Sequence, residues 1–287
     1  MNRGVVFVGA MVLGAGLLGG AGCSLAGIGA GALLHPSRRT AIPPPPDGCS
    51  NVTFAGAGVS LDAWRCAATT DRRGTLIYLH GVADNRGSST GVVQRYRSRG
   101  FDVIAYDSRA HGQSTGDSCT YGYYEKQDLA HVIDTLADGP VVLIGTSLGA
   151  AVALQAAAAD PRIRVVVAAE TFSDLRTVAS ERAPFFFTAG TIDRAFTMAA
   201  RDGRFAVTDV SPLRAAPRIQ VPVLLIHGAA DRETPPSHSQ RVFEALPGRR
   251  RLILVPGKGH NQSLSDSVWS DVDRWIDEGL AASGYRT

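Results

Sequence analysis

The chain has 287 residues, enough for one large α/β domain or at most two modest ones. Hydrophobic residues make up 45% of it and charged residues 19%, a balance that excludes disorder throughout the chain. The net charge of +3 comes without a basic cluster or a basic stripe interleaved with aromatic residues, so we expect no nucleic-acid partner.

Residues 1–34 are predicted to be an export or anchoring segment ahead of the folded domain, because no charged residue occurs from Gly4 to Leu34. The stretch around Cys23 resembles a bacterial lipoprotein cleavage site, which implies that Cys23 becomes the lipidated first residue. Two alternatives stay open: a signal peptide cleaved without lipidation, and an uncleaved helix, since the run exceeds the ~20 residues that cross a bilayer. We expect the chain to be exported and attached to the membrane through its N-terminus.

Residues 35–48 are predicted to be a linker, stiffened by four consecutive prolines, and residues 49–287 the folded domain. A β-hairpin is predicted at its start, with strands at residues 51–54 and 61–65. If Phe54 faces Leu61, the same antiparallel register places Cys49 opposite Cys66, close enough for a disulfide. The alternative is a pair of reduced thiols. Cys119 is expected to be free.

Short apolar runs rich in Val and Ile recur along the rest of the chain and predict strands buried on both faces of a parallel sheet. They lie at residues 75–79, 102–106, 141–144, 164–168, 222–226 and 251–255. Helical patterns separate them, at residues 90–98, 123–136, 148–159, 237–245 and 267–281. Together with the hairpin, this alternation predicts an eight-stranded, mostly parallel, twisted sheet with helices on both faces.

The segment Gly145-Thr146-Ser147-Leu148-Gly149 follows one predicted strand and opens an alanine-rich helix. A serine in the middle of such a GxSxG turn is the pattern of a nucleophile elbow, which lifts the hydroxyl clear of the sheet. Ser147 is therefore the candidate nucleophile. The helix N-terminus beneath it offers a partial positive charge to an oxyanion.

With this elbow, the chain resembles the α/β-hydrolase superfamily, and in particular bacterial serine hydrolases related to the prolyl-oligopeptidase and monoglyceride-lipase types. Residues 105–114, AYDSRAHGQS, resemble the YDxRGHGxS signature of that group, with Ala110 where glycine is usual. The resemblance implies an α/β-hydrolase fold and a serine hydrolase acting on a small-molecule acyl substrate. No histidine cluster has metal-ligand spacing, and the chemistry needs no cofactor.

The family's chain order of nucleophile, acid and histidine assigns the other two catalytic residues. Asp231 follows the predicted strand at 222–226 and is expected to orient His260, which follows the last strand and is expected to act as general base. Both loops leave the carboxyl ends of strands, where sites in open α/β sheets gather. Asp174 and Glu233 are the rival acids.

The negative oxygen of a tetrahedral intermediate needs preorganised donors. The backbone N–H of Leu148 is expected to supply one. The other is expected from Val82, because His80-Gly81-Val82 resembles the family's HGx turn.

Residues 171–220 are too long for a simple crossover and predict a small helical cap over the site. Its aromatic residues are expected to pack the cap onto the body or to line an acyl pocket. The predicted function is an exported serine esterase for short or medium acyl esters. The alternatives are a peptidase, amidase or thioesterase with the same triad, and a binding lipoprotein without catalysis.

Overall fold

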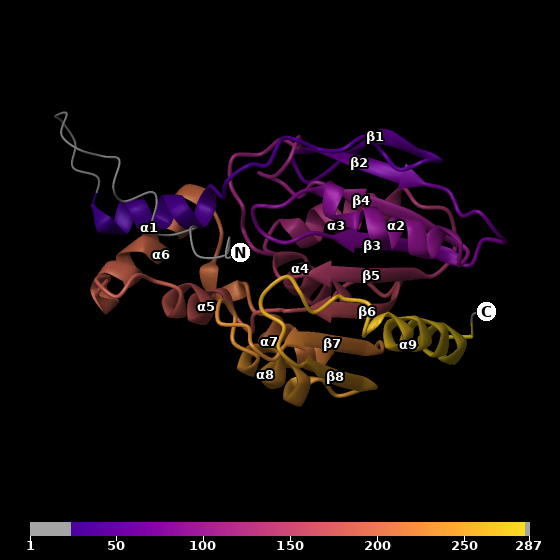
Figure 1. Cartoon of the computed structure of the whole chain (residues 1–287). Helices are drawn as coiled ribbons and strands as arrows, with labels where there is room; N and C mark the ends of the chain where they lie inside the picture. Colours follow the sequence, from indigo (N-terminus) through magenta and orange to yellow (C-terminus); the bar gives the residue numbers. More distant parts are fainter. Residues whose placement is uncertain (1–23, 285–287) are drawn as a thin grey trace.

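Eight strands form one sheet in the order β1-β2-β4-β3-β5-β6-β7-β8 in the computed structural model, which describes residues 24–284 (Figure 1). β1 pairs antiparallel with β2 and β2 antiparallel with β4, while all other pairs are parallel. The strands are β1 (Cys49–Ala55), β2 (Ser60–Cys66), β3 (Gly74–Leu79), β4 (Phe101–Tyr106), β5 (Val141–Thr146), β6 (Ile163–Ala169), β7 (Val223–Gly228) and β8 (Arg250–Val255). The predicted eight-stranded, mostly parallel sheet is confirmed.

Helices cover both faces of the sheet because successive strand residues point to opposite sides. On β5, Val141 and Leu143 belong to one buried apolar cluster and Val142 and Ile144 to another. The first face is covered by α3 (Glu125–Asp134), α4 (Leu148–Ala157) and α8 (Ser237–Ala245), the second by α2 (Thr90–Arg97) and α9 (Trp269–Ala282). A short 3₁₀ helix, η1 (Arg86–Ser89), precedes α2. The predicted helices are all present, with ends shifted by a residue or two.

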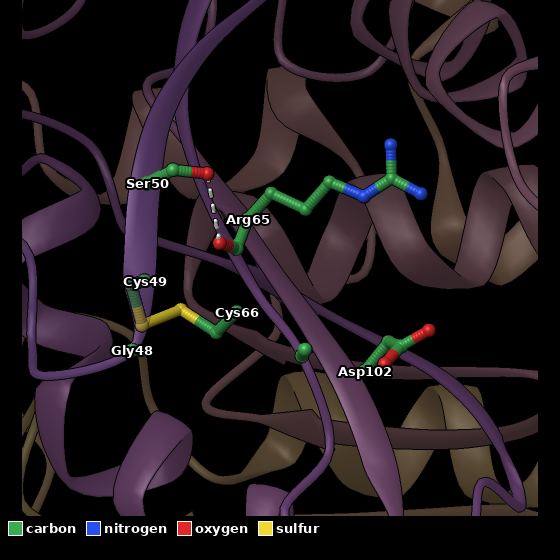
Figure 2. A pocket seen from close by; sticks show the side chains of 7 residues that line it. Gly48, Cys49, Ser50, Arg65, Cys66 and Asp102 are labelled. Atoms are coloured by element: carbon green, nitrogen blue, oxygen red, sulfur yellow. Dashed lines mark hydrogen bonds between the residues drawn. A yellow bond between two sulfur atoms is a disulfide. The ribbon is translucent and has the colours of Figure 1, made fainter.

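The β1–β2 hairpin has the predicted register. Phe54 pairs with Leu61 and Cys49 with Cys66, and the two cysteine sulfurs are bonded in a disulfide (Figure 2). A shallow hollow beside this disulfide is also lined by Arg65 and by Asp102 near the start of β4. It therefore lies at the amino edge of the parallel strands, away from the edge where sites gather. Cys119 is buried and unpaired.

The chain ahead of residue 35 differs from the prediction. Cys23 lies outside the described residues, but Leu25–Leu34 forms helix α1, which packs on the cap instead of standing apart from the fold. Glycines allow the close contact: a Cβ on Gly29 would lie 3.0 Å from Phe187 and 3.2 Å from Ala195. The glycines that weaken an isolated helix here let two helices approach. Within residues 24–284, no helix is both long and apolar enough to cross a membrane.

The predicted helical cap is present between β6 and β7. Its elements are α5 (Leu175–Glu181), α6 (Ala189–Gly203), η2 (Val207–Asp209), α7 (Pro212–Ala215) and η3 (Ala216–Arg218). Phe196 and Phe205 are buried in a cluster that also contains Leu34 of α1 and Ala151 of α4. Phe185 and Phe186 lie outside this buried cluster, and their exposed fractions are 99% and 43%. Figure 1 shows α1, α5 and α6 together at one end of the sheet, with α9 toward the other.

The proline-rich linker follows the surface of the domain. Arg38 donates a hydrogen bond to the carbonyl of Ser114 (2.9 Å), and the Asn85 side chain donates one to the carbonyl of Arg39 (2.8 Å). These contacts hold residues 35–48 against the loops that follow β3 and β4.

Candidate active site

Ser147 stands at a strained turn between β5 and α4. Its φ of 49° and ψ of −111° are unusual for a residue with a side chain. The turn needs glycine on both sides, since a Cβ on Gly145 would lie 2.4 Å from the backbone of Gly149, and one on Gly149 would lie 2.0 Å from the carbonyl oxygen of Leu79. The predicted elbow is therefore built by close backbone packing, and Ser147 is 5% exposed at its tip.

The histidine and acid loops bring two side chains to Ser147. His260 Nε2 lies 2.9 Å from Ser147 Oγ, and His260 Nδ1 lies 2.6 Å from Asp231 Oδ2. An ionised carboxylate can only accept at Nδ1, so Nδ1 carries the proton and Nε2 presents its lone pair to the serine hydroxyl. The structure thus brings together all three residues that the sequence singled out.

The acid loop and the histidine loop are fastened to each other by their backbones. Ala230 donates to the carbonyl of Lys258, at 2.9 Å, and a Cβ on Gly228 would lie 2.4 Å from that same carbonyl oxygen. Only glycine permits this approach. The distance from Asp231 to His260 is consequently set by the main chain.

The Asp231 carboxylate is buried and well supplied with donors. Its Oδ1 accepts from the N–H groups of Glu233 and Thr234, both at 2.9 Å, and His227 Nε2 lies 3.3 Å from its Oδ2. Burial alone would raise the pKa of Asp231, but hydrogen bonds from His227, His260 and the Thr234 N–H outweigh burial and hold that pKa well below its usual range. The carboxylate is negative whenever the protein is folded near neutral pH.

The two rival acids have other surroundings. Asp174 is the N-cap of α5, where its Oδ1 accepts from the Thr177 N–H at 2.8 Å. Glu233 is exposed to solvent. Neither carboxylate is bonded to His260, whose Nδ1 pairs instead with Asp231.

The two residues predicted to form an oxyanion hole, Leu148 and Val82, lie next to the elbow. Leu148 is the first residue of α4, and the N–H groups of a first helical turn have no partner within the helix. Val82 follows Gly81, which lies against the elbow: a Cβ on Gly81 would be 3.5 Å from Ser147 Cβ. The loop after β3 and the start of α4 therefore meet at Ser147.

Glu170 is a buried acid that sequence reasoning missed. It directly follows β6, is 1% exposed, and adopts a φ of 57°. Its carboxylate accepts from three consecutive backbone N–H groups just after His260, namely those of Asn261, Gln262 (3.1 Å) and Ser263 (2.9 Å). Its Oε2 lies 4.0 Å from His260 Nδ1. Glu170 thus fixes the loop that carries the histidine and adds negative charge beside it.

Glu170, Asp231 and His260 form a group of metal-ligand types, since one donor atom of each lies within 4.8 Å of the others. Their lone pairs, however, are engaged by hydrogen bonds: Glu170 by the histidine loop, Asp231 by its own loop and His260. These three side chains therefore form a hydrogen-bond network around the histidine.

The YDxRGHGxS-like segment forms a tightly bonded loop after β4. Ala110, where the family pattern has glycine, adopts a φ of 60°, a left-handed conformation that explains the usual preference for glycine. The imidazole of His111 hydrogen-bonds the carbonyl of Arg109 (2.8 Å) and lies against His80, whose Nε2 accepts from the Ser108 N–H. Burial first, and His80 second, lower the pKa of His111 to about 4.

The cap is attached beside this site. Its apolar cluster contains Ala151, one turn after Ser147 in α4, and Phe172 just after β6. Arg182 donates to the carbonyl of Glu233 at 2.7 Å, and His238 Nε2 donates to Glu181 at 2.7 Å. The end of α5 is thereby tied to the loop that carries Asp231.

Comparison with known proteins agrees with this geometry. The model of the alpha/beta hydrolase family matches residues 76–274. The chain belongs to the alpha/beta hydrolase family. The protein YqkD of Bacillus subtilis is 32% identical over 69% of this chain and 68% of its own length. The monoglyceride lipase of Rattus norvegicus is 23% identical over 78% of this chain and 88% of its own length.

Among solved structures, an esterase from Pyrococcus furiosus superposes with a TM-score of 0.65 at 22% identity, covering 86% of this chain and 98% of its own. This likeness confirms the predicted α/β-hydrolase fold.

Proposed function

We propose that this family member is a serine ester hydrolase with Ser147 as nucleophile, His260 as general base and Asp231 as orienting acid. The observation that carries the proposal is the continuous hydrogen-bonded chain from Ser147 Oγ through His260 to Asp231, with distances of 2.9 and 2.6 Å. A serine hydroxyl becomes a useful nucleophile only when a positioned base accepts its proton.

The proposed reaction has two halves. His260 Nε2 takes the proton of Ser147 while Oγ bonds to the ester carbonyl carbon, and the N–H groups of Val82 and Leu148 bind the oxygen that becomes negative. The bond from carbon to the leaving oxygen then breaks, and His260 passes its proton to that oxygen. Water, deprotonated by the same histidine, attacks the acyl-enzyme, and the carboxylic acid leaves as Ser147 regains its proton.

We propose esters of short or medium acyl chains as substrates. A deep tunnel for a long chain needs a continuous apolar lining. In the cap, Phe196 and Phe205 are committed to packing and Phe185 faces solvent, so few large apolar side chains remain for such a lining. Each methylene that enters an apolar pocket adds about 0.8 kcal/mol, so the preference should rise with chain length and stop where the pocket ends.

The test is kcat/KM on p-nitrophenyl esters from acetate to palmitate, together with aminoacyl anilides. Ser147→Ala should lower turnover by about 10⁴-fold or more, and the Ser147→Ala/His260→Ala double variant should be little worse, because triad members act as a unit. Ser263→Ala is the matched control, since this buried hydroxyl has no hydrogen-bond partner among the described residues. A maximum at palmitate, or faster cleavage of anilides than of butyrate, would contradict the substrate proposal.

We further propose that the chain is exported and held at a membrane through its N-terminus. The uncharged run from Gly4, the cleavage-site pattern at Cys23 and a Cys49–Cys66 disulfide support this, because disulfides persist in oxidising compartments. Mass spectrometry of the mature protein should find a lipidated Cys23, and Cys23→Ala should release the protein from membranes or leave a larger precursor. An unmodified N-terminus elsewhere would refute the lipidation.

A further inference from the structure

Exposed apolar side chains are concentrated in one place on this protein. Among the described residues, five large apolar side chains are exposed, and four of them are Leu25, Ile28, Phe185 and Phe186. The fifth, Leu254, is on β8. We call Leu25, Ile28, Phe185 and Phe186 the apolar tip. Single exposed apolar residues are ordinary, but a contiguous group marks an interaction surface.

Phe187 links the helix that carries Leu25 and Ile28 to Phe185 and Phe186. Leu25 and Ile28 are three residues apart on α1 and share one face of it. Gly29, beside Ile28, lies against the ring of Phe187, as a Cβ there would be 3.0 Å away. The rings of Phe187 and Phe186 are 5.5 Å apart, and those of Phe186 and Phe185 also 5.5 Å. The tip therefore joins the start of α1 to the turn between α5 and α6.

The local structure of that turn pushes the rings outward. The N–H of Phe187 donates to the carbonyl of Pro184 at 2.8 Å, which closes a turn with Phe185 and Phe186 at its two central positions. Phe185 is left 99% exposed. Exposing a whole phenylalanine ring to water is unfavourable by itself, so an apolar environment that receives the ring would offset this cost.

We propose that the apolar tip inserts into the surface of a lipid bilayer. The chain enters the tip directly from residues 4–23, which contain no charged residue, because Ser24 is the N-cap of α1 and Leu25 its first residue. Any anchoring of that segment in a bilayer brings the tip to the same surface. A fluid bilayer accepts a protruding ring without a matching pocket, and interfacial segments bury their apolar faces only about 5–10 Å deep.

A second copy of the chain is the rival occupant. A stable protein interface buries about 800 Å² on each partner, and a whole aromatic side chain buries about 150–250 Å². Of the four tip side chains only Phe185 is more than half exposed, so the tip alone is too small for such an interface. An apolar hollow lined by Leu129, Ile133 and Ala156 could receive a ring from another copy, which makes self-association a necessary arm of the test.

Docking at the tip orients the site toward the lipid. The tip lies on α1 and on the turn between α5 and α6, and the buried cluster that joins α1 to the cap reaches Ala151, one turn past Ser147. An acyl ester dissolved in the bilayer would then meet the side of the molecule that carries the elbow. This last step rests on the proposed ester hydrolase, whereas the insertion of the tip does not.

The experiment places an environment-sensitive fluorophore on Phe185→Cys in the full-length Cys23→Ser chain, reconstituted in phosphatidylcholine vesicles with or without phosphatidylglycerol. Leu254→Cys is the matched control, because Leu254 is exposed but lies outside the tip. Lipids carrying a quencher on the upper acyl chain should remove roughly half of the emission at position 185, given an insertion depth of ~5–10 Å, and little at position 254.

Equal quenching at both positions, or quenching at neither, would overturn the proposal. So would a concentration-dependent change at position 185 without vesicles, which would show that a second copy covers the tip. In a parallel assay, Phe185→Ser/Phe186→Ser should hydrolyse water-soluble p-nitrophenyl acetate normally but act about tenfold more slowly on an ester held in vesicles. If the unsubstituted protein hydrolyses neither p-nitrophenyl acetate nor the ester in vesicles, the proposed ester hydrolase is contradicted, whereas the insertion of the tip is not.

Discussion

The carboxyl edge of the sheet and the cap are built in different ways. At the sheet edge, Ser147, Asp231 and Glu170 are buried, and so is the side chain of His260, which is 4% exposed. Backbone hydrogen bonds fix the two carboxylates, and glycines allow the close backbone approaches at the elbow and between the acid and histidine loops. The cap is held by an apolar cluster and by a few side-chain bonds, and Phe185 at its turn is almost fully exposed. From this difference we expect the sheet edge to hold its side chains more rigidly than the cap.

The strongest test of this contrast compares one carboxylate from each region. Asp231→Asn should lower kcat by about 10⁴-fold, because an amide in that place favours the wrong histidine tautomer. Asp174→Asn in the cap should leave kcat nearly unchanged, and Asp174→Ala should lower the free energy of unfolding by about 1 kcal/mol through loss of the α5 N-cap. Steady-state kinetics and thermal unfolding measure both. A larger kinetic effect at Asp174 would reverse the assignment of the acid.

Glu170 tests whether the histidine loop depends on its buried carboxylate. Glu170→Gln keeps the size of the side chain but removes its charge. The new amide NH₂ group is a donor and cannot accept the backbone N–H groups that the carboxylate accepts. We expect kcat to fall by about 10- to 100-fold with little change in KM, since small displacements of a catalytic group have effects of this size.

The control for Glu170 is Glu233→Gln, an exposed carboxylate on the neighbouring acid loop, which should change kcat less than about twofold. A parallel shift in the acid limb of the pH–rate profile of Glu170→Gln would show that its charge acts on His260, since a purely structural role would leave the limb in place. Unchanged kcat in Glu170→Gln would show that the loop holds itself.

The smallest expected effect concerns stability in acid. His111 in the folded protein takes up its proton only near pH 4, whereas an unfolded imidazole does so near ~6.5, so the unfolded state binds more protons between these values. The stabilisation by neutral His111 is therefore full above about pH 6.5 and is lost as the pH falls, by about 2 kcal/mol between roughly pH 7 and pH 5. Urea unfolding of the wild type and of His111→Gln measures it, and equal pH slopes would contradict the assignment.

The sequence predicted those parts of the site that follow the ends of strands. GxSxG after β5, Asp231 after β7 and His260 after β8 are recognisable because motif and strand end coincide. Glu170 also follows a strand, β6, but its partners are backbone N–H groups more than ninety residues away, and these leave no mark in side-chain identity. The one sequence feature that could have indicated Glu170 is its position directly after the apolar strand β6, where an acidic side chain is unusual.

Burial was the other limit of prediction. The uncharged, glycine-rich residues 25–34 resemble the end of an export segment, and only the presence of α6 shows why small residues are needed there. Likewise, the sequence does not distinguish the exposed phenylalanines of the cap from the buried ones. The turn at Pro184 directs Phe185 outward, while Phe196 points inward from α6, and this distinction requires the tertiary structure.

Labelling with a fluorophosphonate, followed by peptide mass mapping, shows directly whether Ser147 is an activated nucleophile. We expect one phosphonyl adduct on Ser147 in the folded protein, none in Ser147→Ala or in the unfolded chain, and labelling at least about 10³-fold slower in His260→Ala. An adduct on another residue, or ester hydrolysis that persists in Ser147→Ala without labelling, would contradict it.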